Sequence, residues 1–140
     1  MRETGGRGAE WEHGGMNAEN PFLRRLGPLL LDVVLVVLFA TLGARTHHDG
    51  GPTITEVADV AWPFLVGLGV VHATVRMPWS VRFGLFAWVG TVAIGMVLRQ
   101  ATGDGTAFSF IVVATLFNLA TLVGWRLVAA LVARRKARDA

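Results

Sequence analysis

The sequence predicts an all-α integral membrane protein, a bundle of four transmembrane helices. Hydrophobic residues make up 53% of the 140-residue chain and charged residues only 16%, against about 25% charged residues in ordinary soluble domains. Four apolar runs fill most of the chain, and each approaches the roughly 20 residues that a helix needs to cross a bilayer. The segments between them are shorter than the roughly 50 residues of a separate soluble domain. The predicted spans are residues 26–43, 57–75, 83–98 and 106–132.

The first span, 26–43, follows a Gly-rich stretch of mixed charge without apolar periodicity. We interpret residues 1–25 as a disordered cytoplasmic leader. Met16 is an alternative to Met1 as the start of translation, because it would leave a compact basic leader. Pro28 is expected in the first turn of the helix, where its missing N–H costs little.

The second and third spans carry proline and small residues at informative positions. In the second span, either a helix begins near Ala61 with Pro63 in its first turn, or it begins near Val57 and kinks at Pro63. In the third span, small residues recur every four positions and therefore share one face. Since helices in lipid approach closely through small residues, this face is predicted to pack against another helix of the chain, with a homodimer interface as the alternative. The three residues are Ala87, Thr91 and Gly95.

The fourth span, 106–132, follows a tight turn at 103–105, and Thr106 is the expected N-cap. Ala120 and Gly124 repeat the small-residue spacing, and Gly67 and Gly69 thin the second span. Residues 133–140 are predicted to form a basic cytoplasmic tail.

The basic residues next to the spans are distributed unevenly between the two sides of a four-span bundle. One side holds eight of them and the other holds two, Arg45 and Arg99. Because cytoplasmic flanks carry the excess of Lys and Arg, we expect an inner-membrane protein with both termini cytoplasmic. The eight are Arg24, Arg25, Arg76, Arg82, Arg134, Arg135, Lys136 and Arg138.

Tryptophan positions fit the same arrangement. Three indoles, from Trp62, Trp79 and Trp125, fall near the predicted membrane interfaces, where such rings concentrate. Trp88 lies in the middle of a span and therefore requires a packing explanation.

Ionisable side chains inside spans are expensive and are therefore functional candidates. Asp32, His72 and Arg126 fall at similar depth on the cytoplasmic side, and Asn118 lies near the middle of the fourth span. The favoured interpretation is a static Asp32–Arg126 ion pair with His72 as a neighbour, and an interhelical hydrogen bond for Asn118. The alternatives are a carboxylate that couples proton or substrate movement, an Arg126 that reaches the headgroups independently, and an Asn118 that lines a pathway.

A second group of polar and turn residues lies on the predicted outer face. A turn with a capped helix explains them best, although a helix N-terminus beside Arg99 is also able to hold an anion or a lipid phosphate. His47, His48 and Asp49 are weak metal candidates, and a solvated Gly-rich loop is the favoured interpretation of this segment. The outer-face candidates are Arg45, Asp59, Arg99, Gly103, Gly105 and Thr106.

Several function classes are disfavoured by what the sequence contains. The absence of cysteine excludes disulfides, thiolate metal sites and cysteine nucleophiles. No catalytic motif occurs, so no enzyme, cofactor or metal is expected. The net charge of +3 comes from arginines that flank apolar runs, which indicates topology and lipid contacts and gives no indication of nucleic acid.

Three stretches resemble the uncharacterised bacterial membrane family known as domain of unknown function 3054. They are LLLDVVLVVLFATLGARTHH (29–48), AWPFLVGL (61–68) and GMVLRQATGDGTAFSFIVVATLFNLATLVGWRLV (95–128). The resemblance covers most of residues 28–131 and implies a small helical membrane protein, without an activity, substrate or cofactor. It marks as motif positions Asp32, Arg45, His47, Trp62, Pro63, Arg99, Thr102, Gly103, Gly105, Thr106, Trp125 and Arg126.

Three function hypotheses remain. The first is a non-enzymatic structural or accessory membrane protein that contacts membrane lipids and acts as a homodimer or with an unidentified membrane partner. The second is a small dimeric transporter that uses Asp32 as the coupling carboxylate. The third is a lipid-binding or lipid-modifying role at the outer turn. An Asp32 locked against Arg126 in a dry bundle favours the first hypothesis, and an Asp32 in a water-filled cavity favours the second.

Overall fold

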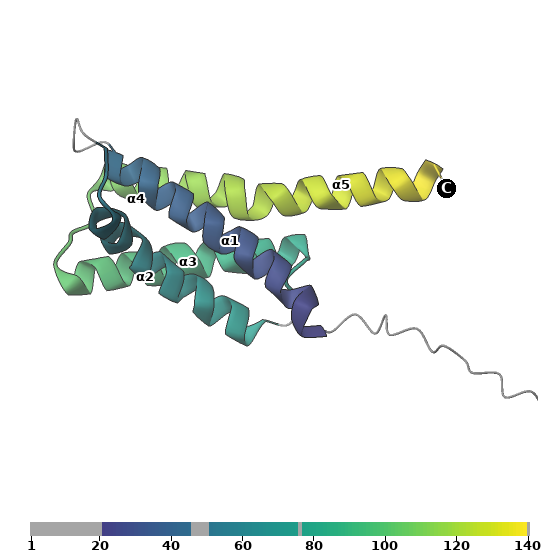
Figure 1. Ribbon diagram of the computed structural model, residues 1–140, viewed down its shortest axis with the longest axis horizontal. Coiled ribbons are helices and arrows are strands. Elements are labelled where there is room, and N and C mark those ends of the chain that lie inside the picture. The colour runs from purple at the N-terminus through teal and green to yellow at the C-terminus, as the bar shows by residue number, and fades with distance from the viewer. Residues whose placement is uncertain (1–20, 46–50, 76, 140) are drawn as a thin grey trace, which may run out of the picture.

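In the computed structural model, the described part of the chain comprises residues 21–45, 51–75 and 77–139, and its regular structure is entirely helical (Figure 1). This confirms the predicted all-α fold class. The last three helical elements follow one another without a break and form one long helix. The elements are α1 (Pro21–Ala44), α2 (Ile54–Thr74), α3 (Val81–Thr102), α4 (Phe108–Asn118), the π-helical segment η2 (Leu119–Val123) and α5 (Gly124–Asp139).

Four helices are long and apolar enough to cross a membrane: Arg25–Ala44, Ile54–Thr74, Val81–Thr102 and Phe108–Asp139. The outer surface of the bundle is apolar, unlike that of a soluble protein. Large apolar side chains such as Val34 and Leu116 cover the outside of the bundle, whereas Asp32 and Arg126 are 0% exposed. Lipid is the solvent that accepts such a surface, so the chain is a multi-pass membrane protein, as predicted.

The first three helices begin earlier than the predicted apolar runs, whereas α4 begins two residues later than predicted, at Phe108. Helix α1 starts at Pro21, so the last residues of the predicted disordered leader are helical, and Pro28 lies inside the helix instead of in its first turn. Helix α2 starts at Ile54, ahead of both predicted starts, because Thr53 and Glu56 form a reciprocal capping box. Pro63 therefore lies within α2.

The connection between α3 and α4 corrects a second prediction. Helix α3 ends at Gly103, whose φ of 85° is the left-handed conformation that glycine adopts without strain. The N-cap of α4 is Ala107, without a side-chain capping bond. Thr106, the predicted cap, donates its hydroxyl to Gln100 Oε1 across the turn (3.0 Å). The polar side chain thus closes the loop instead of the helix end.

The small-residue face of α3 packs against α2, as predicted. Thr91 and Ala87 are fully buried. A Cβ built on Gly67 would lie 3.0 Å from Thr91 Cα, and one on Gly95 would lie 2.6 Å from the Phe64 ring. These backbones therefore approach to a distance that only small residues permit.

For Ala120, Gly124 and Gly69 the expected packing against another helix of the chain is wrong, and the homodimer alternative stays a prediction. Ala120 is exposed, and a Cβ added to Gly124 or to Gly69 would meet no described atom within 4 Å outside its own stretch of helix. Spacing alone could not distinguish these residues from those of α3, because small side chains are also tolerated where a helix faces lipid.

The centre of the bundle is aromatic. Phe39 of α1 packs edge-on against Phe64 of α2 (ring centroids 5.2 Å apart) and also contacts Phe110 and Phe117 of α4 (6.0 and 5.6 Å). Mid-span Trp88 donates its indole N–H to Thr115 O of α4 (2.9 Å), which supplies the packing explanation that its position required.

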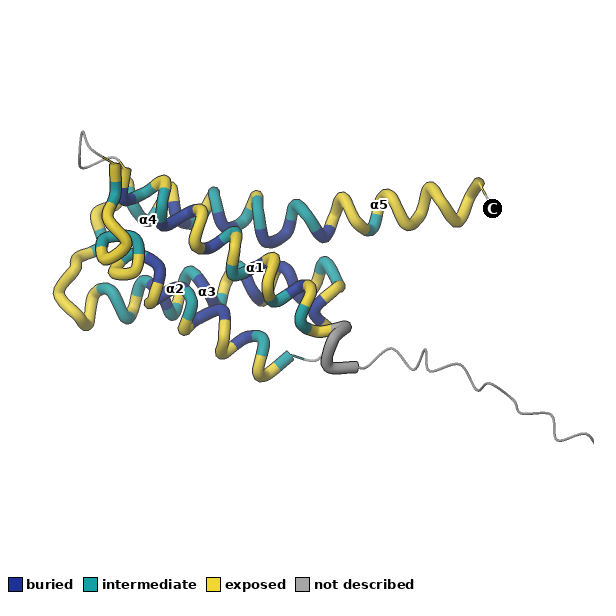
Figure 2. The backbone as a smooth tube through the Cα atoms, in the orientation of Figure 1, coloured by how far each residue is buried: buried dark blue, intermediate teal, exposed yellow. Residues whose placement is uncertain are grey.

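The long helix α4–η2–α5 extends beyond the other helices. Its 32 residues span about 48 Å at 1.5 Å per residue, whereas a bilayer core is about 30 Å thick. The last part of α5 projects from the bundle (Figure 1) and is exposed almost throughout (Figure 2). We call this end of the bundle the tail end, and the end with residues 51–53 and 103–107 the loop end.

Candidate functional site

Polar groups from four parts of the chain meet towards the tail end of the bundle. Helix α1 contributes Asp32, α2 contributes His72 near its last turn, and α5 contributes Trp125 and Arg126 from its first turn. We call these four residues the Asp32 cluster. The segment between α2 and α3 adds the carbonyl of Pro78. The charged pair has no exposure to solvent or lipid.

Asp32 is the acceptor at the centre of the cluster. Its Oδ1 accepts from Arg126 Nη1 and from Trp125 Nε1, both at 2.9 Å. Its Oδ2 accepts from Arg126 Nη2 at 2.6 Å and contacts His72 Nε2 at 2.8 Å. Each carboxylate oxygen therefore has two partners, and the Arg126 fork is bidentate, the strongest geometry for such a pair.

Arg126 uses its remaining donors on backbone carbonyls. Its Nε donates to Pro78 O at 2.9 Å, and Nη1 also donates to Leu122 O, one turn earlier in the same helix, at 2.6 Å. The guanidinium lies over the Trp125 ring at 4.3 Å and near the Phe83 ring at 5.1 Å. A buried cation is thus surrounded by acceptors and by aromatic faces.

Access for this arginine depends on Gly84 in α3. A Cβ at that position would lie 2.9 Å from Arg126 Cδ and 3.1 Å from Leu122 O. The glycine leaves the gap through which the arginine side chain passes.

Aromatic rings border the cluster. The His72 ring meets Phe83 edge-on with centroids 4.7 Å apart, and its side chain is 10% exposed. Trp79 packs edge-on against Trp125 at 5.9 Å, and Gly27 of α1 lies beside the Trp79 ring. Within the cluster, His72 and Trp125 are partly exposed, whereas Asp32 and Arg126 are fully buried.

The π-helical segment η2 lies immediately before Trp125 and Arg126. A π-turn adds a residue to a helical turn and so rotates everything that follows it. Gly124 closes this segment, and the next two residues both reach Asp32. The π-segment is therefore the local feature that sets the direction of the two donors relative to α4.

The structure brings together three of the four predicted intramembrane residues. His72 and Arg126 both contact Asp32, as the matched depth of the three residues suggested. Asn118 is buried but does not join them: its Nδ2 donates to Ala114 O of its own helix at 2.8 Å, and its Oδ1 has no partner among the described residues. The interhelical hydrogen bond predicted for Asn118 is therefore wrong.

Two members of the site were missed. Trp125 was predicted to anchor the helix at the membrane interface, but its indole N–H donates a hydrogen bond to Asp32. The Pro78 carbonyl is a backbone group that sequence does not reveal. The adjacency of Trp125 to Arg126 was the available signal, because consecutive residues after a helical distortion can share a target.

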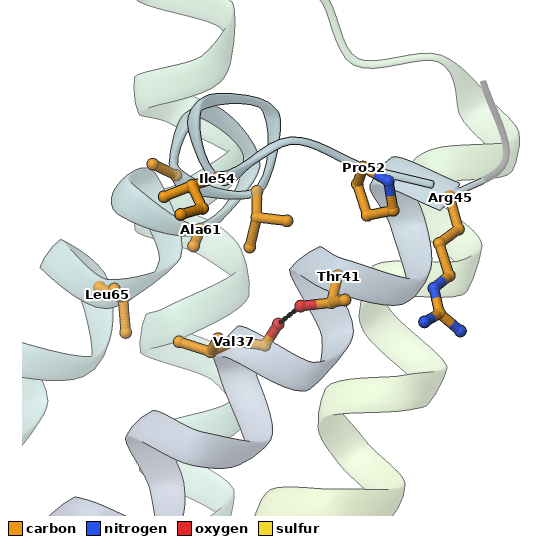
Figure 3. A pocket seen from close by; sticks show the side chains of 9 residues that line it. Val37, Thr41, Arg45, Pro52, Ile54, Ala61 and Leu65 are labelled. Atoms are coloured by element: carbon orange, nitrogen blue, oxygen red, sulfur yellow. Dashed lines mark hydrogen bonds between the residues drawn. The ribbon is translucent and has the colours of Figure 1, made fainter. Parts of the chain in front are cut away.

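The predicted outer-face residues do not form one site. Arg45 lines a pocket of about 540 Å³ between α1 and α2. In Figure 3, Arg45 lies at one end of the lining residues and Leu65 at the other, with Thr41 and apolar side chains between them. Asp59 is exposed, and Gly103 and Gly105 serve the turn through φ values of 85° and 71°.

Arg99 lines a different pocket, of about 450 Å³, which we call the Arg99 pocket. Its guanidinium lies 4.6 Å from the centroid of the Phe110 ring. The other lining residues come from α1, α2 and the start of α4, and they include Gly43, Val60, Ala107, Ser109 and Val113. The metal candidates His47, His48 and Asp49 lie outside the described residues, and the described residues contain no group of three metal-ligating side chains.

The chain has four lipid-exposed helices around a buried carboxylate that pairs with an arginine of the same chain. It is therefore a polytopic helical membrane protein. Within that class, the chain belongs to the family described as "Protein of unknown function (DUF3054)", whose family model matches residues 29–129. The matched region includes the whole Asp32 cluster, and it confirms the resemblance seen in the sequence. No curated protein and no solved structure shows a significant match.

Proposed function

We propose that this chain is a non-enzymatic structural or accessory protein of the inner membrane, with both termini in the cytoplasm. The observation that carries the proposal is the saturation of Asp32. A carboxylate that couples transport must exchange its proton or cation with water during each cycle. Asp32 instead has two partners on each oxygen and no exposed surface.

The permanent cation of Arg126 supports the same proposal. A guanidinium in bidentate contact with Asp32 occupies the position where a cationic substrate or ion would have to bind. Displacing it would leave a buried positive charge without a partner, which is strongly unfavourable. The cluster is better suited to fixing α1, α2 and α5 relative to one another than to binding and releasing a charge.

One observation favours the alternative, a small dimeric transporter that uses Asp32. The His72 ring contacts Asp32 Oδ2 and is partly exposed, so it offers a route for protons from the surface. The two functions differ in whether Asp32 becomes reachable from outside the cluster.

A hydrophobic carbodiimide separates the two proposals, because it modifies protonated carboxyl groups that become accessible within membranes. For the full chain in proteoliposomes at neutral pH, we expect no adduct at Asp32 by peptide mass mapping. The Arg126→Gln variant, which loses the bidentate partner, is the positive control and should become reactive. Modification of Asp32 in the unmutated chain, at a rate comparable to that control, would contradict the structural role and favour transport.

Partners follow from the same proposal. Membrane lipids contact the exposed apolar faces, and an accessory protein needs a second copy of itself or another membrane protein. Purification from mild detergent, with copurifying proteins and lipids identified, tests this directly. Recovery of a monomer without any reproducible protein partner would argue against the accessory role.

A further inference from the structure

Among the described residues, Arg99 is a cation without an anionic partner, near the end of α3 at the loop end of the bundle. Within that part of the chain its side chain pairs with no carboxylate and makes no hydrogen bond, and its buried Nε has no acceptor. Its guanidinium lies over the face of the Phe110 ring. Arg126 of the same chain has every type of donor nitrogen engaged. The contrast leaves Arg99 without a counter-charge within the part of the chain that the structure describes.

The Arg99 pocket offers further donors. Helix α4 begins with Ala107 as its N-cap, which supplies no capping side chain, and the first amide of the helix with a backbone acceptor is that of Ile111. The amides of Ser109 and Phe110 precede it and have no acceptor within the helix. Both residues line the pocket together with Arg99, so the arginine and the first turn of α4 border the same space.

The acidic residues nearest to this end of the chain do not neutralise Arg99. The Asp104 carboxylate accepts a hydrogen bond from the Thr102 hydroxyl at 3.0 Å, and Asp59 is exposed on α2. Neither forms an ion pair with Arg99. The described residues therefore supply no anion to the pocket.

Apart from Ser109, the rest of the pocket lining is apolar, and part of it lies on the outer surface of the bundle. Val60 and Val113 line it, and Val113 is 56% exposed on the outer surface of α4. Arg99 lies in the last turn of a membrane-spanning helix, the level at which basic side chains meet lipid headgroups. A lipid whose phosphate lies at Arg99 and whose acyl chain lies along Val60 and Val113 would match both the charged and the apolar part of the pocket.

We propose that the Arg99 pocket binds the phosphate of an anionic phospholipid from the adjoining leaflet. The Arg99 guanidinium provides the charge, the first turn of α4 provides amide donors, and Val60 and Val113 border the start of an acyl chain. This inference goes beyond the proposed function and does not depend on the Asp32 cluster.

The test uses the full chain in detergent, with lipid binding followed by native mass spectrometry. The probes are phosphatidylglycerol, which is anionic, phosphatidylcholine, which is zwitterionic, and inorganic phosphate as a competitor. Arg99→Gln removes the charge, and Ser109→Trp fills the pocket without changing charge. Arg45→Gln is the matched control, because Arg45 is a second arginine at the loop end that lines a different pocket.

We expect the tightest phosphatidylglycerol site to weaken about tenfold or more in Arg99→Gln, the loss that follows from removing a hydrogen-bonded charge. Ser109→Trp should weaken it comparably, Arg45→Gln should change it less than about twofold, and phosphatidylcholine should bind more weakly to the unmutated chain. If Arg99→Gln fails to fold, Ser109→Trp decides alone, since Ser109 is exposed.

Two results would overturn the proposal. The first is unchanged phosphatidylglycerol binding in the pocket variants, or equal binding of phosphatidylcholine. The second is full displacement of the lipid by inorganic phosphate at the same concentration, which would assign the pocket to a free anion.

Discussion

Single residues explain how a buried charged pair is tolerated inside this bundle. An ion moved from water into a low-dielectric interior costs several kcal/mol unless partners compensate it. Asp32 recovers that cost through partners from α2 and α5, and Arg126 recovers it through Asp32 and two backbone carbonyls. The pair is therefore stable only as a unit.

The first prediction follows from this dependence. Asp32→Asn and Arg126→Gln should each destabilise the bundle strongly, because removing one member of a buried pair typically costs about 3–5 kcal/mol. The double variant should recover much of that loss, since no uncompensated charge then remains. The measurement is a double-mutant cycle in melting temperature in detergent.

Additive effects of the two single variants would contradict this prediction. So would an Asp32→Asn variant that is as stable as the unmutated chain, which is the behaviour expected of a coupling carboxylate in a wet cavity.

A second prediction concerns the gap beside Arg126. Gly84→Ala should destabilise the bundle by about 1–3 kcal/mol, the usual cost of overpacking, because the new Cβ meets the arginine side chain and the Leu122 carbonyl. Gly124→Ala is the matched control, a helical glycine with open space around its Cβ position. The control should be neutral or slightly stabilising. Equal melting temperatures for the two alanine variants would remove the steric argument.

At the scale of elements, hydropathy predicted the four spans because a bilayer imposes a fixed length of apolar sequence. The helix ends were less predictable. Thr53 and Glu56 extend α2 ahead of its apolar run through a capping box, whereas Thr106 looked like a cap and instead closes a loop. Local polar side chains have several acceptors within reach, and their choice depends on tertiary structure.

Part of the candidate site was also predictable, because ionisable side chains inside a span are costly. Burial cost and matched depth identified Asp32, His72 and Arg126 from their positions alone. The π-segment that directs Trp125 left no recognisable pattern in the sequence. Asn118 was expected to find an interhelical partner, but its amide instead donates to the carbonyl of Ala114 one turn earlier, as is common for short polar side chains in helices.

A third prediction tests the contact between α2 and α3. Thr91→Leu should lower stability more than Val89→Leu, because Thr91 is fully buried beside Gly67, whereas Val89 is 54% exposed. Overpacking this contact should cost about 1–3 kcal/mol, and a larger side chain at an exposed site should cost little. Thermal unfolding of both variants in detergent is the measurement. A Val89→Leu variant as unstable as Thr91→Leu would show that the small-residue face does not limit packing.

On the scale of the whole molecule, the two ends of the bundle differ in charge. The tail end carries Arg25 and Arg82 and the basic projection of α5, and the loop end carries Arg45 and Arg99. The Asp32 cluster lies towards the tail end, and the aromatic centre of the bundle packs between it and the loop end. The molecule therefore presents a strongly basic end and a pocketed end to the two sides of a membrane.

The last prediction is the orientation that this asymmetry implies. Basic flanks are retained on the cytoplasmic side, so the tail end should be cytoplasmic and residues 103–107 should face outward.

The chain has no cysteine, which allows Asp104→Cys and Ala137→Cys to be labelled individually with a membrane-impermeant maleimide. Both positions are exposed. In intact cells the cysteine at position 104 should react, and the one at position 137 should react only after lysis. A cytoplasmic reporter fused after Ala140 should likewise be active. The opposite labelling pattern would invert the topology and would move the Arg99 pocket to the cytoplasmic leaflet.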